Sequence, residues 1–349
     1  MANHDAKREA GTLDGTPDKR LFYSIINDYD IPTAICELVD NSIDLWMKGG
    51  RKTALSVEIT ADVERQLINI SDTAGGVREG ELRVLIAPGA SANSLEGQTI
   101  GVFGVGSKRA VVALAEHISI KTRHKGGATY QIDITPEWIS SDSWEIPHYT
   151  VSDVPIGRTE IELRSLRKPI SEILVSRLRR RLGETYSWFL AIDHCKILLN
   201  GTEIEALEFD DWAYPPENPP HVIRSQVPVD GGNVSVEITA GLILDRDPVE
   251  ENYGAYFYGN NRLIAKEVKD REVGYWTASQ AGVPHPDASL CRVIVRLNGP
   301  AKAMPWNSSK TRINYAHPVF QAIQDQAIKL VSHFSSLSRR LKDDWPNKV

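Results

Sequence analysis

The chain has 349 residues, of which 41% are hydrophobic and 25% are charged, as in an ordinary globular protein of one to three domains. Its 46 acidic residues outnumber the 40 basic ones, and the net charge of −6 excludes an overall positive field that would recruit nucleic acid. No apolar run approaches the ~20 residues of a membrane span, and residues 1–15 lack the apolar core of a signal peptide. The widely spaced Cys36, Cys195 and Cys291 fit no metal-binding pattern and predict buried thiols in a reducing cytoplasm.

The N-terminal part of the chain divides into two segments before the first long helix. Residues 1–18 are polar and predict a flexible N-terminus. Residues 21–29 are apolar and aromatic, and they can form a helix that packs on the element that follows.

The most informative stretch is a helix predicted over residues 32–47. Pro32 suits a first helical turn, and the glycines at 49 and 50 supply the end. One face is apolar at helical spacing, which predicts a side packed on a core. The other face carries polar residues at positions i, i+4 and i+7: Glu37, Asn41 and Asp44. A plain surface helix is the alternative, and only the glycine-rich stretches downstream argue against it.

Two alternating segments, residues 53–60 and 66–71, predict an antiparallel pair of strands. The second strand runs into Asp72-Thr73-Ala74-Gly75-Gly76, an acid followed by two glycines. This pattern indicates a tight turn where backbone approaches a ligand, with an ordinary turn as the alternative.

A second glycine-rich stretch follows a short helix predicted over residues 79–86 and a small, polar loop. Residues 97–109 contain four glycines and lead into an apolar helix predicted over residues 110–115. A glycine-rich turn at a helix N-terminus can cradle phosphate, because its unpaired N–H groups and the helix dipole face the anion. The spacing is not that of a Walker A loop.

The remaining elements complete two domains, with a boundary expected near residue 200 and a proline-rich stretch over residues 210–220. The helix predicted over residues 171–190 carries a cluster of four arginines: Arg177, Arg179, Arg180 and Arg181. The cluster indicates a solvated face or, alternatively, a contact with nucleic acid. Alternating segments predict strands at residues 117–123, 127–134, 159–163, 234–244, 254–258, 262–264 and 290–297, and a long amphipathic helix ends the chain.

Taken in order, these stretches resemble the motifs of the GHKL ATPase superfamily, which includes gyrase-type topoisomerase subunits, ninety-kilodalton heat-shock chaperones, MutL and MORC proteins. The run from Glu37 to Asp44 (ELVDNSID) is similar to that family's N-box, in a MutL-like form. The run from Gly101 to Gly106 (GVFGVG) is similar to the second glycine box of the chaperones and MORC proteins. The resemblance implies an α+β fold: a Bergerat-type sandwich with a mixed, mostly antiparallel sheet over residues 19–200, and a smaller transducer-like α/β domain over residues 201–349.

The same resemblance implies ATP and Mg²⁺ as cofactors and gives a role to each motif. Glu37 would polarise the attacking water, and Asn41 would hold Mg²⁺ through its side-chain oxygen. Asp72 would accept from the exocyclic amine of adenine, with Thr159 supporting it through a water, and Asp44 would brace the site. The other nucleotide-binding residues implied lie in the glycine-rich stretches: Gly76, Gly101, Gly104, Val105, Gly106, Ser107 and Lys108.

Three further expectations come with the family. Lys310 lies where relatives place a lysine that reaches the γ-phosphate from the second domain, with plain surface as the alternative. Residues 87–98 correspond to an ATP lid whose closure accompanies dimerisation. Ala74 departs from the usual first glycine box, and because alanine disfavours a positive φ, the adenine pocket is expected to differ there.

The resulting hypothesis is a cytoplasmic ATPase that hydrolyses slowly, dimerises with ATP and acts through an effector protein in trans, in DNA transactions or anti-phage defence. A sensor kinase is disfavoured, because residues 1–18 hold no phospho-acceptor helix and kinase relatives tend to lack the residue equivalent to Glu37. A non-hydrolysing ATP-gated module and a DNA-binding ATPase subunit remain as alternatives.

Overall fold

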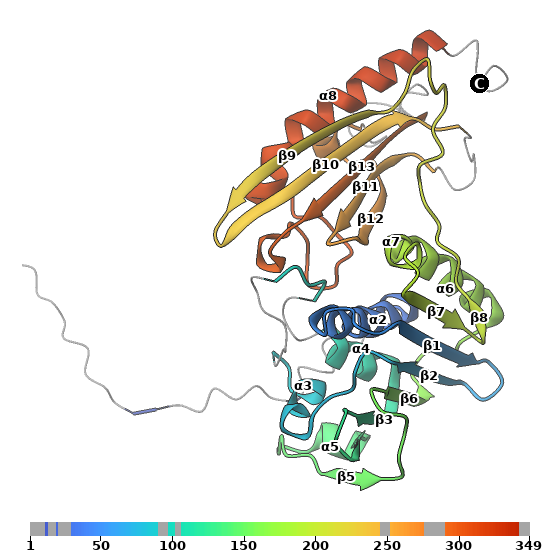
Figure 1. Cartoon of the computed structure of the whole chain (residues 1–349), viewed down its shortest axis with the longest axis vertical. Helices are drawn as coiled ribbons and strands as arrows, with labels where there is room; N and C mark the ends of the chain where they lie inside the picture. Colours follow the sequence, from blue (N-terminus) through green and yellow to red (C-terminus); the bar gives the residue numbers. More distant parts are fainter. Residues whose placement is uncertain are drawn as a thin grey trace, which may run out of the picture.

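The computed structural model describes residues 11–12, 19, 29–89, 97–101, 106–244, 252–275 and 290–341. Within these ranges the chain forms two sheets, each with its own hydrophobic core and helices (Figure 1). The predicted α+β class, a mostly antiparallel sandwich followed by a smaller α/β domain, is confirmed. No helix of these ranges combines the length and the apolar character that crossing a bilayer demands.

The first domain is built on a sheet of eight strands in the order β5-β4-β3-β6-β2-β1-β7-β8. Neighbouring strands are antiparallel except β1 and β7, which are parallel. The strands are β1 (Leu55–Asp62), β2 (Leu67–Asp72), β3 (Ala115–Arg123), β4 (Thr129–Ile134), β5 (His148–Val151), β6 (Thr159–Leu166), β7 (Cys195–Leu199) and β8 (Thr202–Glu203).

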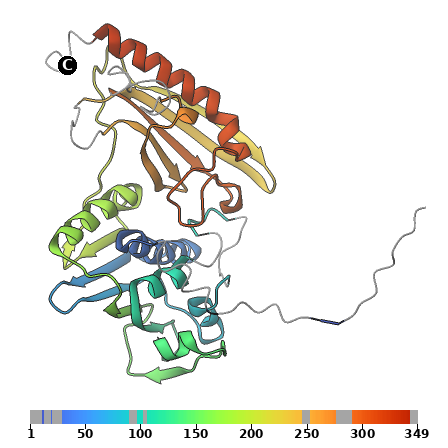
Figure 2. The same ribbon diagram turned by 180° about the vertical axis from the view of Figure 1, so that it is seen from behind.

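Helices cover one face of this sheet (Figures 1 and 2). In β1 the apolar side chains face the helices and the polar ones alternate with them, so the sheet is apolar on the covered side. The helices in the described part of this domain are α2 (Ile31–Lys48), α3 (Arg83–Ile86), α4 (Gly106–Leu114), α5 (Pro136–Ser140), α6 (Glu172–Thr185) and α7 (Ser187–Leu190), with a 3₁₀ turn at Glu79–Glu81.

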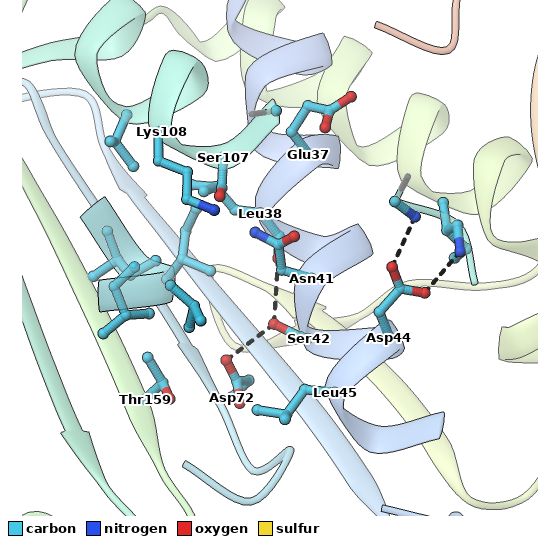
Figure 3. A pocket seen from close by; sticks show the side chains of 18 of the residues that line it. Glu37, Leu38, Asn41, Ser42, Asp44, Leu45, Asp72, Ser107, Lys108 and Thr159 are labelled. Atoms are coloured by element: carbon cyan, nitrogen blue, oxygen red, sulfur yellow. Dashed lines mark hydrogen bonds between the residues drawn. The ribbon is translucent and has the colours of Figure 1, made fainter. Parts of the chain in front are cut away.

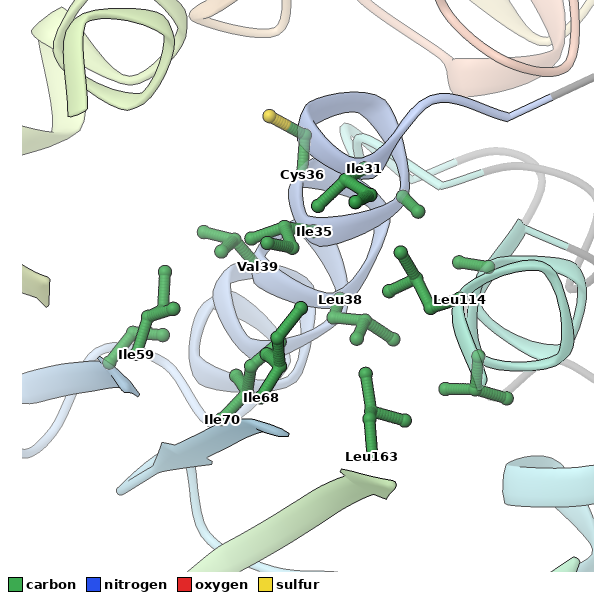
Figure 4. Packing of buried hydrophobic residues seen from close by; sticks show 14 of the residues in the cluster. Ile31, Ile35, Cys36, Leu38, Val39, Ile59, Ile68, Ile70, Leu114 and Leu163 are labelled. Carbon is green, nitrogen blue, oxygen red and sulfur yellow. The ribbon is translucent and has the colours of Figure 1, made fainter. Parts of the chain in front are cut away.

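Helix α2 is the centre of the first core. It begins with Asp30, whose side chain accepts a hydrogen bond from the Thr33 N–H, and it ends at Gly49. Figure 4 shows Ile35, Leu38 and Val39 of α2 directed at Ile59, Ile68 and Ile70 of the sheet. The acids of the opposite face are buried as well, so α2 is enclosed between the sheet and the second domain and is not a surface helix.

The described residues of the second domain form a sheet of five strands in the order β12-β11-β13-β10-β9, antiparallel except for the pair β11 and β13. Helix α8 (Pro318–Leu341) lies along one face and packs its apolar stripe on the sheet (Figure 2). The strands are β9 (His221–Val229), β10 (Gly232–Leu242), β11 (Gly254–Gly259), β12 (Arg262–Val268) and β13 (Cys291–Asn298), with 3₁₀ turns at Arg271–Val273 and Ala301–Ala303.

Several sequence expectations for individual elements are wrong. The single helix expected over residues 171–190 is interrupted at Tyr186, where φ is −112° and ψ is 18°, so that α6 and α7 are separate helices. The helix expected over residues 110–115 begins earlier, at Gly106, and Ala115 already belongs to β3. The short helix expected over residues 79–86 is a 3₁₀ turn followed by α3. The sequence patterns do not predict α5, β5, β7, β8 and β9.

Some expectations concern residues that lie outside the described ranges. The residues concerned are most of residues 1–18, all of residues 21–28, the central part of the expected lid, and Gly104 and Val105 of the second glycine box. The boundary expected near residue 200 falls between β7 and β8, which pair with each other.

Candidate nucleotide-binding site

A pocket opens between α2, α4, the sheet and a loop of the second domain (Figure 3). One wall is the polar face of α2, and the opposite wall is the first turn of α4. The floor is apolar and comes from β2, β3 and β6, and residues 306–310 of the second domain close one side. The pocket brings together most of the residues singled out from the sequence: Glu37, Asn41, Asp44, Asp72, Gly101, Gly106, Ser107, Lys108, Thr159 and Lys310.

Glu37 and Asn41 lie one helical turn apart on the pocket side of α2. Glu37 is only 3% exposed, whereas Asn41 is exposed within the pocket and its amide is accessible to a ligand. The first turn of α4 approaches Glu37 very closely, since a Cβ at Gly106 would lie 1.9 Å from Glu37 Oε2. Gly106 is therefore required for the present position of the Glu37 carboxylate.

Asp72 lies at the apolar end of the pocket, where β2 ends. Its carboxylate accepts hydrogen bonds from the Ser42 hydroxyl and the Ala74 N–H, each at 2.9 Å. Burial raises the pKa of Asp72 to about 6, although these two donors oppose the shift. Thr159 lies nearby and its hydroxyl is 3.0 Å from that of Thr122. This end of the pocket offers one buried acceptor surrounded by apolar side chains.

The turn after Asp72 explains how Ala74 is accommodated. The positive φ values of the turn fall on Gly75, at 127°, and Gly76, at 67°, and Ala74 is not among the residues with positive φ. Gly76 lies outside the pocket lining, and a Cβ there would lie 2.2 Å from the carbonyl oxygen of Arg123. The strained positions of this turn are thus glycines, and alanine at position 74 needs no unusual backbone conformation.

Asp44 holds the segment that leads to the second glycine box. Its two carboxylate oxygens accept hydrogen bonds from the N–H groups of Ile100 and Gly101, at 2.8 and 2.7 Å. Burial raises the pKa of Asp44 to about 7, against the effect of these two bonds. This geometry is that of a side chain that fixes backbone, as the sequence analysis expected of a brace.

The first turn of α4 supplies positive charge to the pocket. Gly106 and Ser107 begin the helix, and the unpaired N–H groups of a helix N-terminus attract anions. The Lys108 side chain points into the pocket between α4 and α2 (Figure 3), and burial lowers its pKa to about 8. An anion bound here would meet both the helix N-terminus and an ammonium group.

Lys310 reaches the pocket from the second domain. Its Nζ donates a hydrogen bond to Glu37 Oε1 at 2.6 Å and lies 3.0 Å from Asp40 Oδ2. Burial opposes the charged form, but Glu37 and Asp40 outweigh it and raise the pKa of Lys310. The residue has a φ of 52°, which is unusual for a side chain other than glycine. The plain surface position considered from the sequence is therefore wrong for this side chain.

Three residues around Lys310 were given no role in the sequence analysis. Asp40 follows Glu37 by three positions, so it lies on a neighbouring part of the same helix face. Its Oδ1 accepts hydrogen bonds from Arg262 Nε and from the Tyr186 hydroxyl, both at 2.7 Å. Helical spacing could have indicated Asp40, whereas Arg262 is 222 positions away in sequence and carries no local signal.

The pocket has a buried acid at its apolar end and positive charge at the N-terminus of a helix. This combination suits a nucleotide, because the flat base fits an apolar end and the anionic phosphates fit a positive one. Residues 29–164 match the family described as histidine kinase-, DNA gyrase B- and HSP90-like ATPases. This part of the chain is accordingly a GHKL-type ATPase domain with the Bergerat fold, as the sequence analysis predicted. No curated protein matches the chain.

Proposed function

We propose that this protein binds ATP with Mg²⁺ and hydrolyses it slowly, as a conformational switch between its two domains. The observation that supports hydrolysis best is the position of Glu37. Its carboxylate lines the pocket next to the N-terminus of α4 and 2.6 Å from the ammonium of Lys310. A carboxylate that accepts a proton from water, next to cations that neutralise phosphate charge, is the combination that phosphoryl transfer to water requires.

The pocket fits the two ends of ATP separately. Adenine would occupy the apolar end, where Asp72 accepts a hydrogen bond from the exocyclic amine and Thr159 supports it through a water. The phosphates would lie at the other end, against the backbone of Gly101 and the first turn of α4, with Lys108 and Lys310 contributing charge. Gly104 and Val105 are assigned to the same phosphate contacts from the sequence alone, and Gly76 serves the turn that shapes the adenine end.

Mg²⁺ would be shared between Asn41 and the phosphates. In the described ranges no group of three or more His, Cys, Asp and Glu side chains is arranged to hold a metal ion. Asn41 is exposed within the pocket, one turn from Glu37, and an amide oxygen is a ligand that a hard cation accepts. When bound, the ion would supply charge neutralisation between the phosphates.

The switch would operate through Lys310. Because this residue belongs to the second domain, a γ-phosphate that draws Lys310 away from Glu37 would change the contact between the domains. We expect closure to accompany formation of an ATP-dependent homodimer and to be passed to an effector protein in trans. Kinship to MutL or MORC proteins, and a role in DNA transactions or anti-phage defence, stay predictions from the resemblance.

A DNA-acting ATPase subunit is less well supported. The arginine cluster of α6 is partly used within the protein, since Arg180 pairs with Glu184 at 2.9 Å and Arg179 donates to the Leu199 carbonyl. Arg177 and Arg180 are exposed and keep a contact with phosphate backbone open.

The test is ATP turnover by wild type and Glu37→Ala, each followed by gel filtration with and without a non-hydrolysable ATP analogue. Glu37→Ala should lower turnover by roughly 10²- to 10⁴-fold, because the group that accepts the water's proton is removed, and should still bind the analogue. Glu64→Ala, which removes an exposed glutamate in the β1–β2 turn, is the matched control and should turn over like wild type. Turnover by Glu37→Ala at the wild-type rate would contradict the role of Glu37 as the group that accepts the water's proton. An elution volume that the analogue does not change would contradict the proposed ATP-dependent dimer.

A further inference from the structure

A cluster of charged groups is buried between the two domains, and one of them, Lys310, also lines the pocket. Arg262, at the start of β12, and Asp40, on α2, are each 1% exposed, and Lys310 is 4% exposed. Buried charges persist only when they are paired and hydrogen-bonded. The pairing in this cluster is therefore informative about what each group does.

The two oxygens of Asp40 have different partners. Oδ1 is held by two donors, Arg262 Nε and the Tyr186 hydroxyl. Oδ2 receives no hydrogen bond from the described residues and lies 3.0 Å from Lys310 Nζ. One side of the carboxylate is thus fixed by the surrounding fold, and the other side is directed at the lysine.

Arg262 also holds the backbone of Lys310. Its Nη1 donates to the carbonyl of Lys310 at 3.3 Å and to that of Leu263 at 3.1 Å. The same guanidinium therefore contacts both the lysine's main chain and the lysine's second counter-ion. The Asp40 carboxylate thus has a cation on each side, with Arg262 Nε at 2.7 Å from Oδ1 and Lys310 Nζ at 3.0 Å from Oδ2, and these two pairs compensate its burial as an anion.

We propose that Arg262 is a positioning residue for Lys310. It holds the Lys310 backbone, and it fixes Asp40 as the anion that retains the Lys310 ammonium when the Glu37 carboxylate accepts a proton from the attacking water. The inference rests on the proposed function in one respect, since it takes Lys310 to be the residue that meets the γ-phosphate. In the present structure the ammonium lies between two carboxylates, Glu37 and Asp40. If Asp40 were not held, Glu37 would be the sole anchor of Lys310 and would remain engaged with it.

A purely structural role is the alternative, and the second sheet offers a matched control. Arg292 on β13 is 2% exposed and is held like Arg262, by the carbonyls of Phe209 and Asn252 and by the carboxylate of Asp211. Arg292 does not line the pocket. Replacement of either arginine by lysine keeps the charge and removes the fork that reaches several acceptors at once.

The experiment compares wild type, Arg262→Lys, Tyr186→Phe, Arg292→Lys and Lys310→Met. Two readouts are taken: kcat for ATP, and the ratio of affinities for a non-hydrolysable ATP analogue and for ADP. Only the first nucleotide carries a γ-phosphate, so this ratio measures the action of Lys310 without turnover. Thermal unfolding of each variant reports the structural cost.

Arg262→Lys should lower kcat by up to roughly 100-fold, because misplacement of a catalytic group by about 1 Å has that effect, and should reduce the affinity ratio. Tyr186→Phe should do the same more weakly, since one of two donors to Oδ1 is lost. Arg292→Lys should lower the melting temperature about as much as Arg262→Lys does, and it should leave kcat and the affinity ratio unchanged. Adding Arg262→Lys to Lys310→Met should cause no further loss, because the two residues act as one unit.

Equal effects of Arg262→Lys and Arg292→Lys on the two readouts, or multiplicative effects of Arg262→Lys and Lys310→Met, would overturn the proposal. A wild type without turnover would contradict the proposed hydrolysis alone, because the affinity ratio would still decide the role of Arg262. A Lys310→Met variant with the wild-type ratio would contradict the role of Lys310 and, with it, this inference.

Discussion

The two halves of the pocket bury their acids in opposite ways. Near the start of α2, Glu37 and Asp40 face the cations Lys310 and Arg262, and the pKa of Asp40 is lowered. Asp44, near the end of α2, and Asp72, at the end of β2, accept hydrogen bonds from backbone N–H groups and a hydroxyl, and burial raises their pKa values to about 7 and about 6. All four side chains are buried.

Burial alone therefore does not decide the protonation of an acid in this pocket. The partners decide it, because a full positive charge offsets desolvation and a neutral donor offsets only part of it. The end with cations suits chemistry on phosphate, where charge develops. Of the two acids with neutral donors, Asp72 suits recognition of a neutral base and Asp44 suits support of backbone. Three substitutions test this difference.

The largest effect is expected from Lys310→Met, which removes a cation from the charged end. Glu37 would lose its ion-pair partner and Asp40 would keep only Arg262, and breaking a buried ion pair costs about 3–5 kcal/mol. Turnover should fall by roughly 10²- to 10³-fold, as when one stabiliser of transition-state charge is removed. Chemical denaturation and steady-state ATPase assays measure the two losses.

Lys302→Met provides the control, since Lys302 belongs to the same connection between β13 and α8 but lies outside the pocket and is partly exposed. Comparable losses in Lys302→Met and Lys310→Met would show that the effect comes from the loop and not from the buried ion pair.

A smaller effect is expected from Asp44→Asn, which changes an acid held by neutral donors. The folded-state pKa of Asp44 is about 7, above the ~4 of an unfolded chain, so the folded state retains a proton that the unfolded state releases. Between about pH 4 and pH 7 this group therefore lowers the free energy of unfolding of the wild type by up to ~1.4 kcal/mol per pH unit as the pH rises. Asp44→Asn lacks that dependence, and urea unfolding at several pH values measures the difference.

Asp62→Asn is the matched control, because Asp62 accepts a hydrogen bond from a backbone N–H but lies at the exposed β1–β2 turn. Parallel pH profiles for wild type and Asp44→Asn would contradict the raised pKa of Asp44.

The smallest effect is expected from Asp72→Asn, measured with adenosine so that no phosphate titrates. Loss of one buried hydrogen bond should weaken adenosine binding by about tenfold at pH 7. In the wild type, affinity should decline as the pH falls through about 6, because Asp72 becomes protonated and accepts less well. The variant should show no such decline, and Asp133→Asn on β4, outside the pocket, should follow the wild type.

The sequence was informative where the signal is local. Pro32 and the glycines at 49 and 50 predict the limits of α2 to within a residue or two, because caps and breakers act on adjacent backbone. Helical spacing placed Glu37, Asn41 and Asp44 on one face, and the pocket contains all three. The β1–β2 pair is predicted by the alternation of apolar and polar residues, because one face of the sheet is buried and the other is not.

The sequence was silent where partners are distant. Nothing near Arg262 indicates a contact with Asp40, because the pair forms only when the second domain packs on α2. The break at Tyr186 is not predicted either, since an apolar helical pattern continues through it, and the Tyr186 hydroxyl bonds to Asp40, 146 positions away. Tertiary contacts decide such positions, and local propensity does not.

The position of Asp40 at the domain boundary has a consequence for dissecting the chain. A fragment that ends near residue 203 would keep α2 and the eight-stranded sheet but would lose both cations that face Glu37 and Asp40. Water would replace Lys310 and Arg262, and the pKa of Asp40 would lose the two cations that lower it. Nucleotide affinities measured on such a fragment would describe a different electrostatic centre from that of the intact protein.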